Sequence, residues 1–371
     1  MPLNPLYSFD TLPTTSAAAI REFNDRYLAA VGASKPNGWA DTLGELVPTD
    51  RPMVTFPASQ LRTLYRRSEG ESRFKKLREV SIDVKTQEFD DGYEARLMDL
   101  FLEVFAYRNW QRAPERLVLA EEQHRHLQIA TIIDGTGTRG GAVGSSNDPG
   151  GTSRLCLDGQ NMFSTTHPAN MTDSSVASPV TGATTWSNYQ SSAKNILGSV
   201  AVKNTGVFLT DNLQAEVINM QTGVLDENGL LLGADPDTII VPADLYEAAK
   251  NGLMNERLFQ LTTNGTSNDV AAAAVENVYK GRFNVISAKE FTTVSGSTAD
   301  WYLVDSKLLK AGVSPWVSLR QTVPQSLALR VFDEATDYFK NTGNIKLSSH
   351  IWYGFSVMLP HAIRKVTGYT R

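Results

Sequence analysis

The chain has 371 residues, of which 41% are hydrophobic and 20% are charged, and its formal net charge at pH 7 is -5. A chain of this length and composition can fill one large or two ordinary hydrophobic cores. The net charge excludes a globally basic nucleic-acid binder, although a local basic patch stays open. The single cysteine, Cys156, excludes a disulfide framework within one chain and indicates a reducing compartment.

The N-terminal sequence shows no targeting segment. MPLNPLYSFDTL lacks the basic start of a signal peptide, and no uncharged apolar run reaches the length of about 18 residues that a membrane span needs. We therefore expect a protein that is made and matures in a cytoplasm and has no membrane partner.

Residues 1 to 55 are rich in proline and contain one predicted helix, near Ala17 to Ala30. The apolar residues of this helix fall on one side: Ile20, Phe23, Tyr27 and Leu28. That face needs a covering surface, so we expect an arm that packs on a neighbouring molecule. A flexible tail is the alternative, which the aromatic content disfavours.

Residues 56 to 100 predict a long charged hairpin. Val80, Ile82 and Val84 alternate with polar residues, which indicates a half-exposed strand. Asp90-Asp91-Gly92 predicts a turn, and Tyr93 to Leu97 the returning strand. A basic cluster precedes the first strand: Arg62, Arg66, Arg67, Arg73, Lys75, Lys76 and Arg78. This cluster is either a solvated face or a contact for an acidic surface, and the acids interspersed with it disfavour DNA.

The strongest predicted helix runs from Pro114 to Asp134. Proline suits a first helical turn, and apolar residues follow at three- and four-residue spacing: Leu117, Ala120, Leu127 and Ala130. Twenty residues would make a rod of roughly 30 Å. The glycine-rich stretch after Asp134 predicts a loop or linker.

Leu225 to Leu253 predicts a turn, a strand and a helix in succession. Asp226 to Gly229 has turn chemistry, and Thr238 to Val241 is a β-branched run between two prolines, typical of a strand buried on both faces. Ala243 to Leu253 has the apolar spacing of an amphipathic helix.

The remaining segments alternate between predicted helices and strands, which favours an α+β or α/β lobe. We expect an exposed loop over Asn161 to Thr185 and a helix over Trp186 to Val200. Strands are expected over the apolar runs Arg282 to Ser287, Trp301 to Asp305, Ser326 to Phe332 and Lys346 to Leu359.

No catalytic, cofactor-binding or metal-binding residue is predicted. His124 and His126 lie two apart on a helix and point in different directions, so they cannot easily share a metal. Ser164 and His167 could belong to a hydrolase triad, but no G-x-S-x-G elbow accompanies them. Cys156, between Leu155 and Leu157, is expected to be a buried small apolar residue.

Two segments resemble the major head subunits of Mu-like tailed phages. Phe163-Ser-Thr-Thr-His-Pro168 is similar to that family's F-S-T-x-H-P segment. Leu225 to Leu253 is similar to its D-x-x-G turn, Leu-Gly, Pro-Asp, apolar strand, Val-Pro and helix. The resemblance implies an α+β fold of the Hong Kong 97 type. Its parts would be an N-terminal arm (1–55), an extended hairpin loop (56–100), a peripheral domain with a long spine helix (101–154), an axial domain (155–335) and a C-terminal strand returning to the peripheral domain (336–371).

The resemblance also implies a major capsid protein, with no enzymatic activity, that self-assembles in the host bacterial cytoplasm into the icosahedral head of a tailed phage. Expected partners are further copies in hexamers and pentamers, a portal, scaffolding or decoration proteins, and packaged double-stranded DNA through non-specific contacts. The expected subunit-interface residues are Trp39, Tyr65, Arg66, Arg67, Phe74, Lys75, Lys76 and Phe89. An encapsulin-like cage and a soluble hydrolase are the alternatives.

Overall fold

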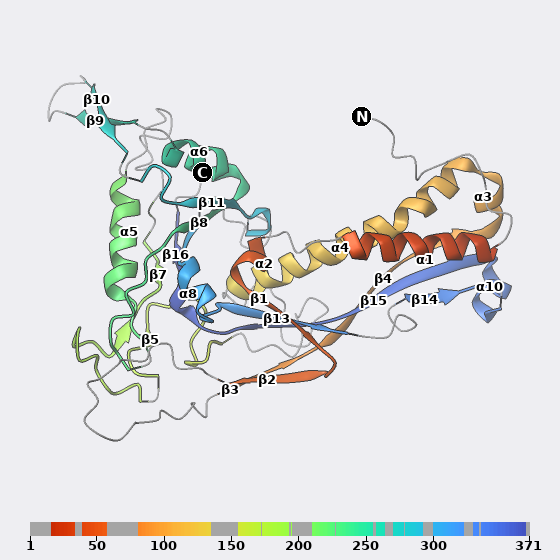
Figure 1. Cartoon of the computed structure of the whole chain (residues 1–371), viewed down its shortest axis with the longest axis horizontal. Coiled ribbons are helices and arrows are strands. Elements are labelled where there is room, and N and C mark those ends of the chain that lie inside the picture. The colour runs from red at the N-terminus through yellow and green to blue at the C-terminus, as the bar shows by residue number, and fades with distance from the viewer. Residues whose placement is uncertain are drawn as a thin grey trace.

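The computed structural model describes residues 16–33, 39–57, 81–134, 155–171, 173–192, 194, 210–226, 228–254, 257–263, 270–277, 279–291, 300–322, 329–333 and 335–368. Figure 1 shows an elongated lobe built along one long helix and a compact lobe at the other end of the molecule. The expected α+β class is confirmed, because helices combine with sheets that hold both parallel and antiparallel pairs. Within the described ranges, every helix is too short or too polar to cross a membrane.

The elongated lobe is organised by one long strand, β15 (Asn344–Val357). This strand pairs antiparallel with β4 (Gln87–Arg96), β13 (Trp316–Gln321) and β14 (Leu329–Phe332), and β1 (Glu45–Thr49) adds parallel to β13. The long strand predicted over Lys346 to Leu359 is thereby confirmed to within two residues at each end.

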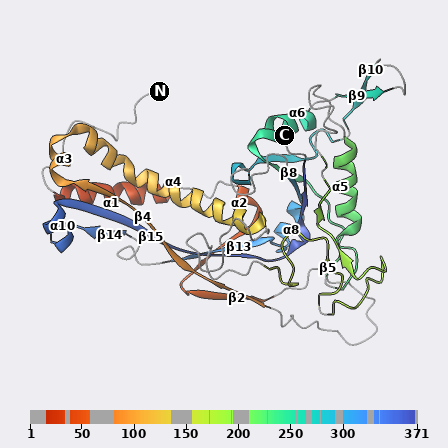
Figure 2. The same ribbon diagram turned by 180° about the vertical axis from the view of Figure 1, so that it is seen from behind.

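Helices run along this sheet (Figure 1). The longest is α4 (Val104–Asp134), whose 31 residues span roughly 46 Å at about 1.5 Å per residue. α1 (Ser16–Ala33) lies beside it, as the view from behind also shows (Figure 2). α3 (Leu97–Leu102) and α10 (Asp337–Thr342) stand at the far end, and the short α2 (Trp39–Leu43) lies near the compact lobe.

The compact lobe has a five-stranded sheet in the order β11 (Asn284–Ser287), β8 (Thr238–Val241), β12 (Trp301–Val304), β16 (Ile363–Val366) and β7 (Tyr189–Gln190). Every residue of β8 and β12 is buried, as the apolar composition of both segments requires. The helices α5 (Thr210–Gly223) and α6 (Ala243–Met254) contribute to the core of this lobe.

Shorter elements complete the compact lobe. They are the hairpin of β9 (Arg257–Thr263) and β10 (Val270–Glu276), the pair β5 (His167–Pro168) and β6 (Thr185–Trp186), the helix α8 (Ser306–Lys310) and the 3-10 turn η2 (Pro360–Ala362). An aromatic core joins the two lobes. Its buried members include Trp39, Phe291, Tyr302, Trp316 and Tyr353.

The predicted turn, strand and helix over Leu225 to Leu253 are confirmed. Asp226 accepts hydrogen bonds through Oδ1 from the backbone N–H of Asn228 and Leu230, at 2.9 Å each, and Gly229 takes a φ of 78° that other residues rarely adopt. The buried face of α6 includes Leu245, Ala249 and Leu253, as its spacing predicted.

The predicted hairpin is wrong in its pairing. β3 (Ser81–Lys85) has the expected alternation of exposed and buried residues, but it pairs with β2 (Met53–Pro57) and not with the segment after Asp91. Residues 58–80, which hold the basic cluster, therefore connect the two strands of the hairpin, beyond the last pair Pro57 and Ser81. That connection lies outside the described residues.

The predicted turn at Asp90-Asp91-Gly92 is also wrong, because all three residues belong to β4. Asp91 and Gly92 pair with Ser349 and Ser348 of β15. Glycine is required there by close approach and not by a turn, since a Cβ on Gly92 would lie 2.6 Å from the carbonyl oxygen of Leu347.

The helix predicted from Pro114 begins ten residues earlier. Pro114 lies inside α4 and not in its first turn. The helix continues through it because both flanks are anchored in the same core, by Tyr107 and Trp110 before the proline and Leu117 after it.

The helix of the N-terminal segment is confirmed, but the neighbour expected to cover its apolar face is not needed. Phe23 is fully buried against Trp110 of the same chain, with ring centroids 5.1 Å apart. Glu22 accepts hydrogen bonds from Tyr107 and, at 2.8 Å, from Gln111. Residues 16–33 are therefore part of the elongated lobe of their own subunit.

The helix predicted over Trp186 to Val200 is wrong in its described part. Trp186 ends β6, and Tyr189 begins β7, which pairs parallel with Lys365 and Val366 of β16. Residues 195–200 lie outside the described residues. The preceding segment is mainly irregular, as expected, but Met162 and His167 within it are fully buried.

The C-terminal segment serves both lobes. β15 lies in the elongated lobe, whereas β16 returns to the compact sheet between β12 and β7. Residues 344–366 thus supply one strand to each lobe.

Candidate functional site

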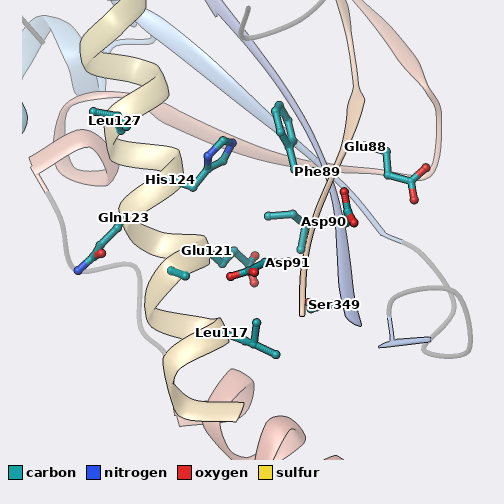
Figure 3. Close-up of a pocket in the computed structure, with 12 residues that line it drawn as sticks. Glu88, Phe89, Asp90, Asp91, Leu117, Glu121, Gln123, His124, Leu127 and Ser349 are labelled. Carbon is teal, nitrogen blue, oxygen red and sulfur yellow. The ribbon is translucent and has the colours of Figure 1, made fainter. Parts of the chain in front are cut away.

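A groove of about 580 Å³ lies between α4 and the strands β4 and β15, in the elongated lobe. Figure 3 shows its two walls, with the helix on one side and the strands on the other. The described residues that line it are Glu88, Phe89, Asp90, Asp91, Leu117, Ala120, Glu121, Gln123, His124, Leu127, Ser349 and Ile351. Four of these carry carboxylates and none is a lysine or arginine, so we call it the acidic groove.

Two of the four carboxylates are engaged within the chain. Glu121 accepts from the hydroxyl of Tyr353 at 2.6 Å and pairs with Arg320 at 2.9 Å. Glu88 lies 2.7 Å from Nδ1 of His350 and 3.1 Å from Arg330. These contacts fix the walls of the groove.

The other two carboxylates, on Asp90 and Asp91, are exposed. One oxygen of Asp91 accepts from the backbone N–H of Gly92 at 2.8 Å, which orients that side chain on the strand. Both residues lie on β4, whose backbone is held by ten register pairs with β15. The groove therefore presents negative charge from a rigid sheet, which favours contact with a cationic partner.

An aromatic pair bridges the two walls. Phe89 of β4 and His124 of α4 lie with ring centroids 4.5 Å apart (Figure 3). Burial lowers the pKa of His124, although the charge of Glu121 opposes this. The neutral imidazole therefore acts as part of an apolar contact between the helix and the strand.

The expected interface residues fall in three places. Phe89 lines the acidic groove. Trp39 is buried in the aromatic core, meets Trp316 edge to face and donates to Glu290 at 2.9 Å, so its indole stabilises the subunit itself. The other six lie outside the described residues: Tyr65, Arg66, Arg67, Phe74, Lys75 and Lys76.

A second polar cluster surrounds His167, the histidine considered for a hydrolase triad. Its Nδ1 lies 2.6 Å from Asp158, and its Nε2 lies 3.0 Å from Oδ1 of Asn188. Ser164 does not meet the imidazole in this arrangement; its hydroxyl lies 3.1 Å from that of Thr166. Both ring nitrogens are thus engaged without a nucleophile.

Asn188 makes the His167 cluster a structural hub. Its Nδ2 donates to the carbonyl oxygens of Met162, Pro360 and Ile363, at 2.8 to 3.3 Å. The cluster therefore ties the irregular segment after Cys156 to the C-terminal strand. It serves the fold of the compact lobe and not a reaction.

Cys156 is buried, as expected, with its Sγ 3.7 Å from the sulfur of Met162. Burial, helped by the charge of Asp158, raises the pKa of the thiol, so it stays protonated and unreactive. Within the described ranges, no group of three or more metal-ligating side chains comes together.

The acidic groove was missed by the sequence prediction. Asp90 and Asp91 fall within the predicted turn, and Glu121 is one polar residue among many on a predicted helix. The one sequence feature that points to the groove is the pair of adjacent acids, Asp90 and Asp91. This pair indicates a site only when β15 is known to be the partner strand.

Comparisons with known proteins identify the family of the chain. A family model described as Phage capsid protein matches residues 159–366, more than half of the chain. No curated protein matches the sequence. The procapsid of bacteriophage JBD30 is similar in structure at 10% identity and a TM-score of 0.47, covering 97% of this chain and 77% of that chain.

Two further solved structures are similar to this one. The capsid of an empty GTA particle is 12% identical with a TM-score of 0.44, covering 91% of each chain. A virus-like particle from Pyrococcus furiosus is 11% identical with a TM-score of 0.42, covering 93% of this chain and 98% of that chain. The assignment rests on the family model: the chain belongs to the phage capsid protein family, as a structural component of the virion and not an enzyme.

Proposed function

We propose that this chain is the major capsid protein that builds the icosahedral head of a tailed bacteriophage and encloses its double-stranded DNA. The observation that carries the proposal is the match of residues 159–366 to the phage capsid family, which covers most of the compact lobe and the strands β13, β14 and β15 of the elongated lobe. Hexamers and pentamers of this chain would form the shell, with a portal at one vertex and scaffolding or decoration proteins as further partners.

The lobes correspond to the domains of a Hong Kong 97-type subunit. In this proposal the compact lobe is the axial domain, and the elongated lobe with α4 as its spine is the peripheral domain. The hairpin of β2 and β3 is the base of the extended loop. The N-terminal arm is shortened to the residues before Ser16, because α1 is packed within its own subunit.

Membership of the Mu-like group is supported by how the two resembling segments meet. Asn170, just after the Phe163 to Pro168 segment, forms a bridge with Asn228 in the Asp226 turn. Ser178 donates to the carbonyl oxygen of Gly229 at 2.5 Å. The chain that follows the first segment thus contacts the turn of the second within the compact lobe.

Subunits would be joined by the basic segment of one copy and the acidic groove of the next. Residues 58–80 carry Arg66, Arg67, Lys75 and Lys76 beyond the end of the β2–β3 hairpin. The groove offers the exposed carboxylate of Asp91 and an aromatic wall at Phe89, while Asp90 is exposed on the opposite face of the same strand (Figure 3). Opposite charges on the basic segment and the rigid groove would set register and partner choice.

The function is tested by electron microscopy of the purified recombinant chain, alone and with co-expressed scaffolding or protease genes. Closed icosahedral shells or capsomers are expected. Nuclease-protected double-stranded DNA in particles from infected or induced cells would separate a phage head from a cage that holds a protein cargo. A monodisperse monomer or dimer under every condition would contradict the proposal.

A further inference from the structure

Another groove lies in the compact lobe, apart from the surfaces to which the proposed assembly gives a role. It encloses about 550 Å³ between α5 and the strands β6 and β7 (Figure 1). Cavities that bind small molecules usually measure roughly 300 to 1,000 Å³. Most of the side chains that line this groove carry a hydroxyl or an amide group, so we call it the hydroxyl groove.

Five of its polar side chains are available to a ligand. Each is exposed and makes no side-chain hydrogen bond within the part of the chain that the structure describes: Thr165, Thr185, Ser191, Ser192 and Asn219. They come from three separate stretches of the chain, which the fold brings to one groove. Hydroxyl and amide groups can both donate and accept, so this set suits a ligand that carries many hydroxyl groups of its own.

The hydroxyl groove offers no exposed charge. The one charged side chain among its described lining residues is Arg364, which is 4% exposed. Its Nε donates to the buried carboxylate of Glu216 at 2.7 Å, and its Nη1 donates to the carbonyl oxygen of Ser187 at 2.8 Å. The guanidinium is therefore held inside the subunit and is not presented to an anion. This distinguishes the hydroxyl groove from the acidic groove.

The sheet edge beside the groove is closed to a peptide strand. β7 is the last strand of the compact sheet, and an open edge can bind an extended peptide by strand addition. Here the hydroxyl of Ser187 accepts from the backbone N–H of Tyr189 at 3.1 Å and donates to its carbonyl oxygen at 2.8 Å. These two groups point away from β16, because β16 and the residue after it donate to Asn188 and Gln190. The groups that a peptide backbone would need are thus already bonded.

An aromatic ring lies among the hydroxyl groups. Tyr189 lines the groove and is half-buried, and its hydroxyl accepts from Thr367 at 3.1 Å, which holds the ring in place. A fixed aromatic ring gives an apolar surface on which the C–H groups of a sugar ring can pack. The hydroxyl groups of the same sugar would then face the polar side chains around it.

We propose that the hydroxyl groove binds a neutral saccharide. The free hydroxyl and amide groups hydrogen-bond the sugar, and the ring of Tyr189 packs against one of its faces. The absence of exposed charge selects uncharged over acidic sugars. The ligand is a free sugar or a unit of a polysaccharide, which share this chemistry. The inference goes beyond the proposed function, because a single copy of the chain contains the whole groove.

An array of immobilised neutral and acidic oligosaccharides tests the ligand class. The purified full chain, labelled with a fluorophore, should bind neutral members and not acidic ones. Competition with free glucose, galactose or mannose distinguishes the two sources: displacement assigns a free sugar as sufficient, and no displacement assigns a unit of a longer chain. Binding to no neutral member, or equal binding to neutral and acidic members, would overturn the proposal.

Paired variants test the location of the site. Thr185→Val combined with Asn219→Ala should weaken binding to the neutral members about tenfold, the effect of losing two uncharged hydrogen bonds. Thermal unfolding should not change, because both side chains are exposed. Thr184→Val combined with Gln214→Ala is the matched control, at exposed positions nearby that do not line the groove. Equal binding by the two double variants would contradict the proposal. The proposed function fails separately, if the unmodified chain forms no shells.

Discussion

His361 is a buried histidine whose ring has no hydrogen-bond partner at either nitrogen among the described residues. It lies against Trp186, with ring centroids 4.9 Å apart. Burial, with a contribution from His167, lowers the pKa of His361 to about 3, although Asp158 acts in the opposite direction. In the unfolded chain the same group takes up a proton near its ordinary pKa of about 6.5.

This difference predicts acid sensitivity of the compact lobe. Because the folded pKa is depressed, stability is fully present above pH 6.5 and is lost as pH falls from there toward 3, by up to about 1.4 kcal/mol per pH unit. His361→Met should reduce that slope between pH 6.5 and 4.5. Denaturant unfolding at several pH values measures it, with pH 8 as the reference for packing effects. An unchanged slope would show that His361 does not carry the effect.

Asp158 extends the acid response to lower pH. Burial alone would raise the pKa of this carboxyl, but the hydrogen bond and charge of His167 outweigh it and lower the pKa. The stabilisation that Asp158 provides is therefore present above its ordinary pKa of about 3.9 and is lost below it. Above about pH 4 the response therefore reports His361 and not Asp158, whereas both groups contribute at lower pH.

Gly92 tests the corrected pairing of β4 with β15. A Cβ at this position would lie 2.6 Å from a backbone oxygen of β15. Gly92→Ala should therefore destabilise the subunit by about 1–3 kcal/mol, the usual cost of forcing an extra methyl group into a packed site. Gly223→Ala is the control, since nothing lies within 4 Å of its added Cβ. Equal unfolding midpoints for the two variants would contradict the pairing.

At the scale of elements, the packing of α1 on α4 decides whether the first helix belongs to its own subunit. Phe23→Ala removes a fully buried ring and should lower the free energy of unfolding of the isolated subunit by about 3–5 kcal/mol. Leu28→Ala, on the same helix but 46% exposed, should cost far less. If both variants behave alike in free subunits, α1 is covered by a neighbour, as the sequence first suggested.

The sequence predicted the elements whose apolar pattern is decided locally. The strand at Thr238, the helix after Ala243 and the alternating strand around Ile82 are each fixed by their own side chains. The turn prediction at Asp90-Asp91-Gly92 is wrong because the glycine is required by the close approach of the Leu347 backbone, more than 250 residues away. Turn chemistry and close approach both select glycine, so sequence cannot separate them.

The site was less predictable than the fold for the same reason. The acidic groove joins β4, α4 and β15, and no one of these segments is acidic enough by itself to indicate a site. The start of α4 was missed because Pro114 has the chemistry of a first turn, and only the tertiary anchors at Tyr107 and Trp110 carry the helix past it.

At the scale of the whole molecule, the proposed shell gives a common role to the buried aromatic core and to the exposed surface of the elongated lobe. The subunit buries aromatic residues at the junction of its lobes, so each lobe can transmit a load to the other. In contrast, the acidic groove is open on the elongated lobe, where it can contribute to a contact with a neighbouring subunit. Strength is then distributed over many small contacts, each weak in the free subunit.

The last prediction concerns the electrostatic part of this assembly. Asp90→Lys combined with Asp91→Lys should slow assembly and raise the subunit concentration that it requires, because like charges would face the basic segment of the next copy. High salt should weaken assembly of the unmodified chain, since the screening length is about 8 Å at 0.15 M and about 3 Å at 1 M. Light scattering during assembly measures both effects.

The control for this experiment is Asp337→Lys, which changes an acid with a 94% exposed side chain on α10, outside the groove. It should assemble like the unmodified chain. Replacing Arg66 and Arg67 by glutamate in the groove variant should restore part of the rate, because the charges are then exchanged and not lost. If the groove variant assembles normally, or if Asp337→Lys is equally impaired, then net charge and not the acidic groove governs assembly.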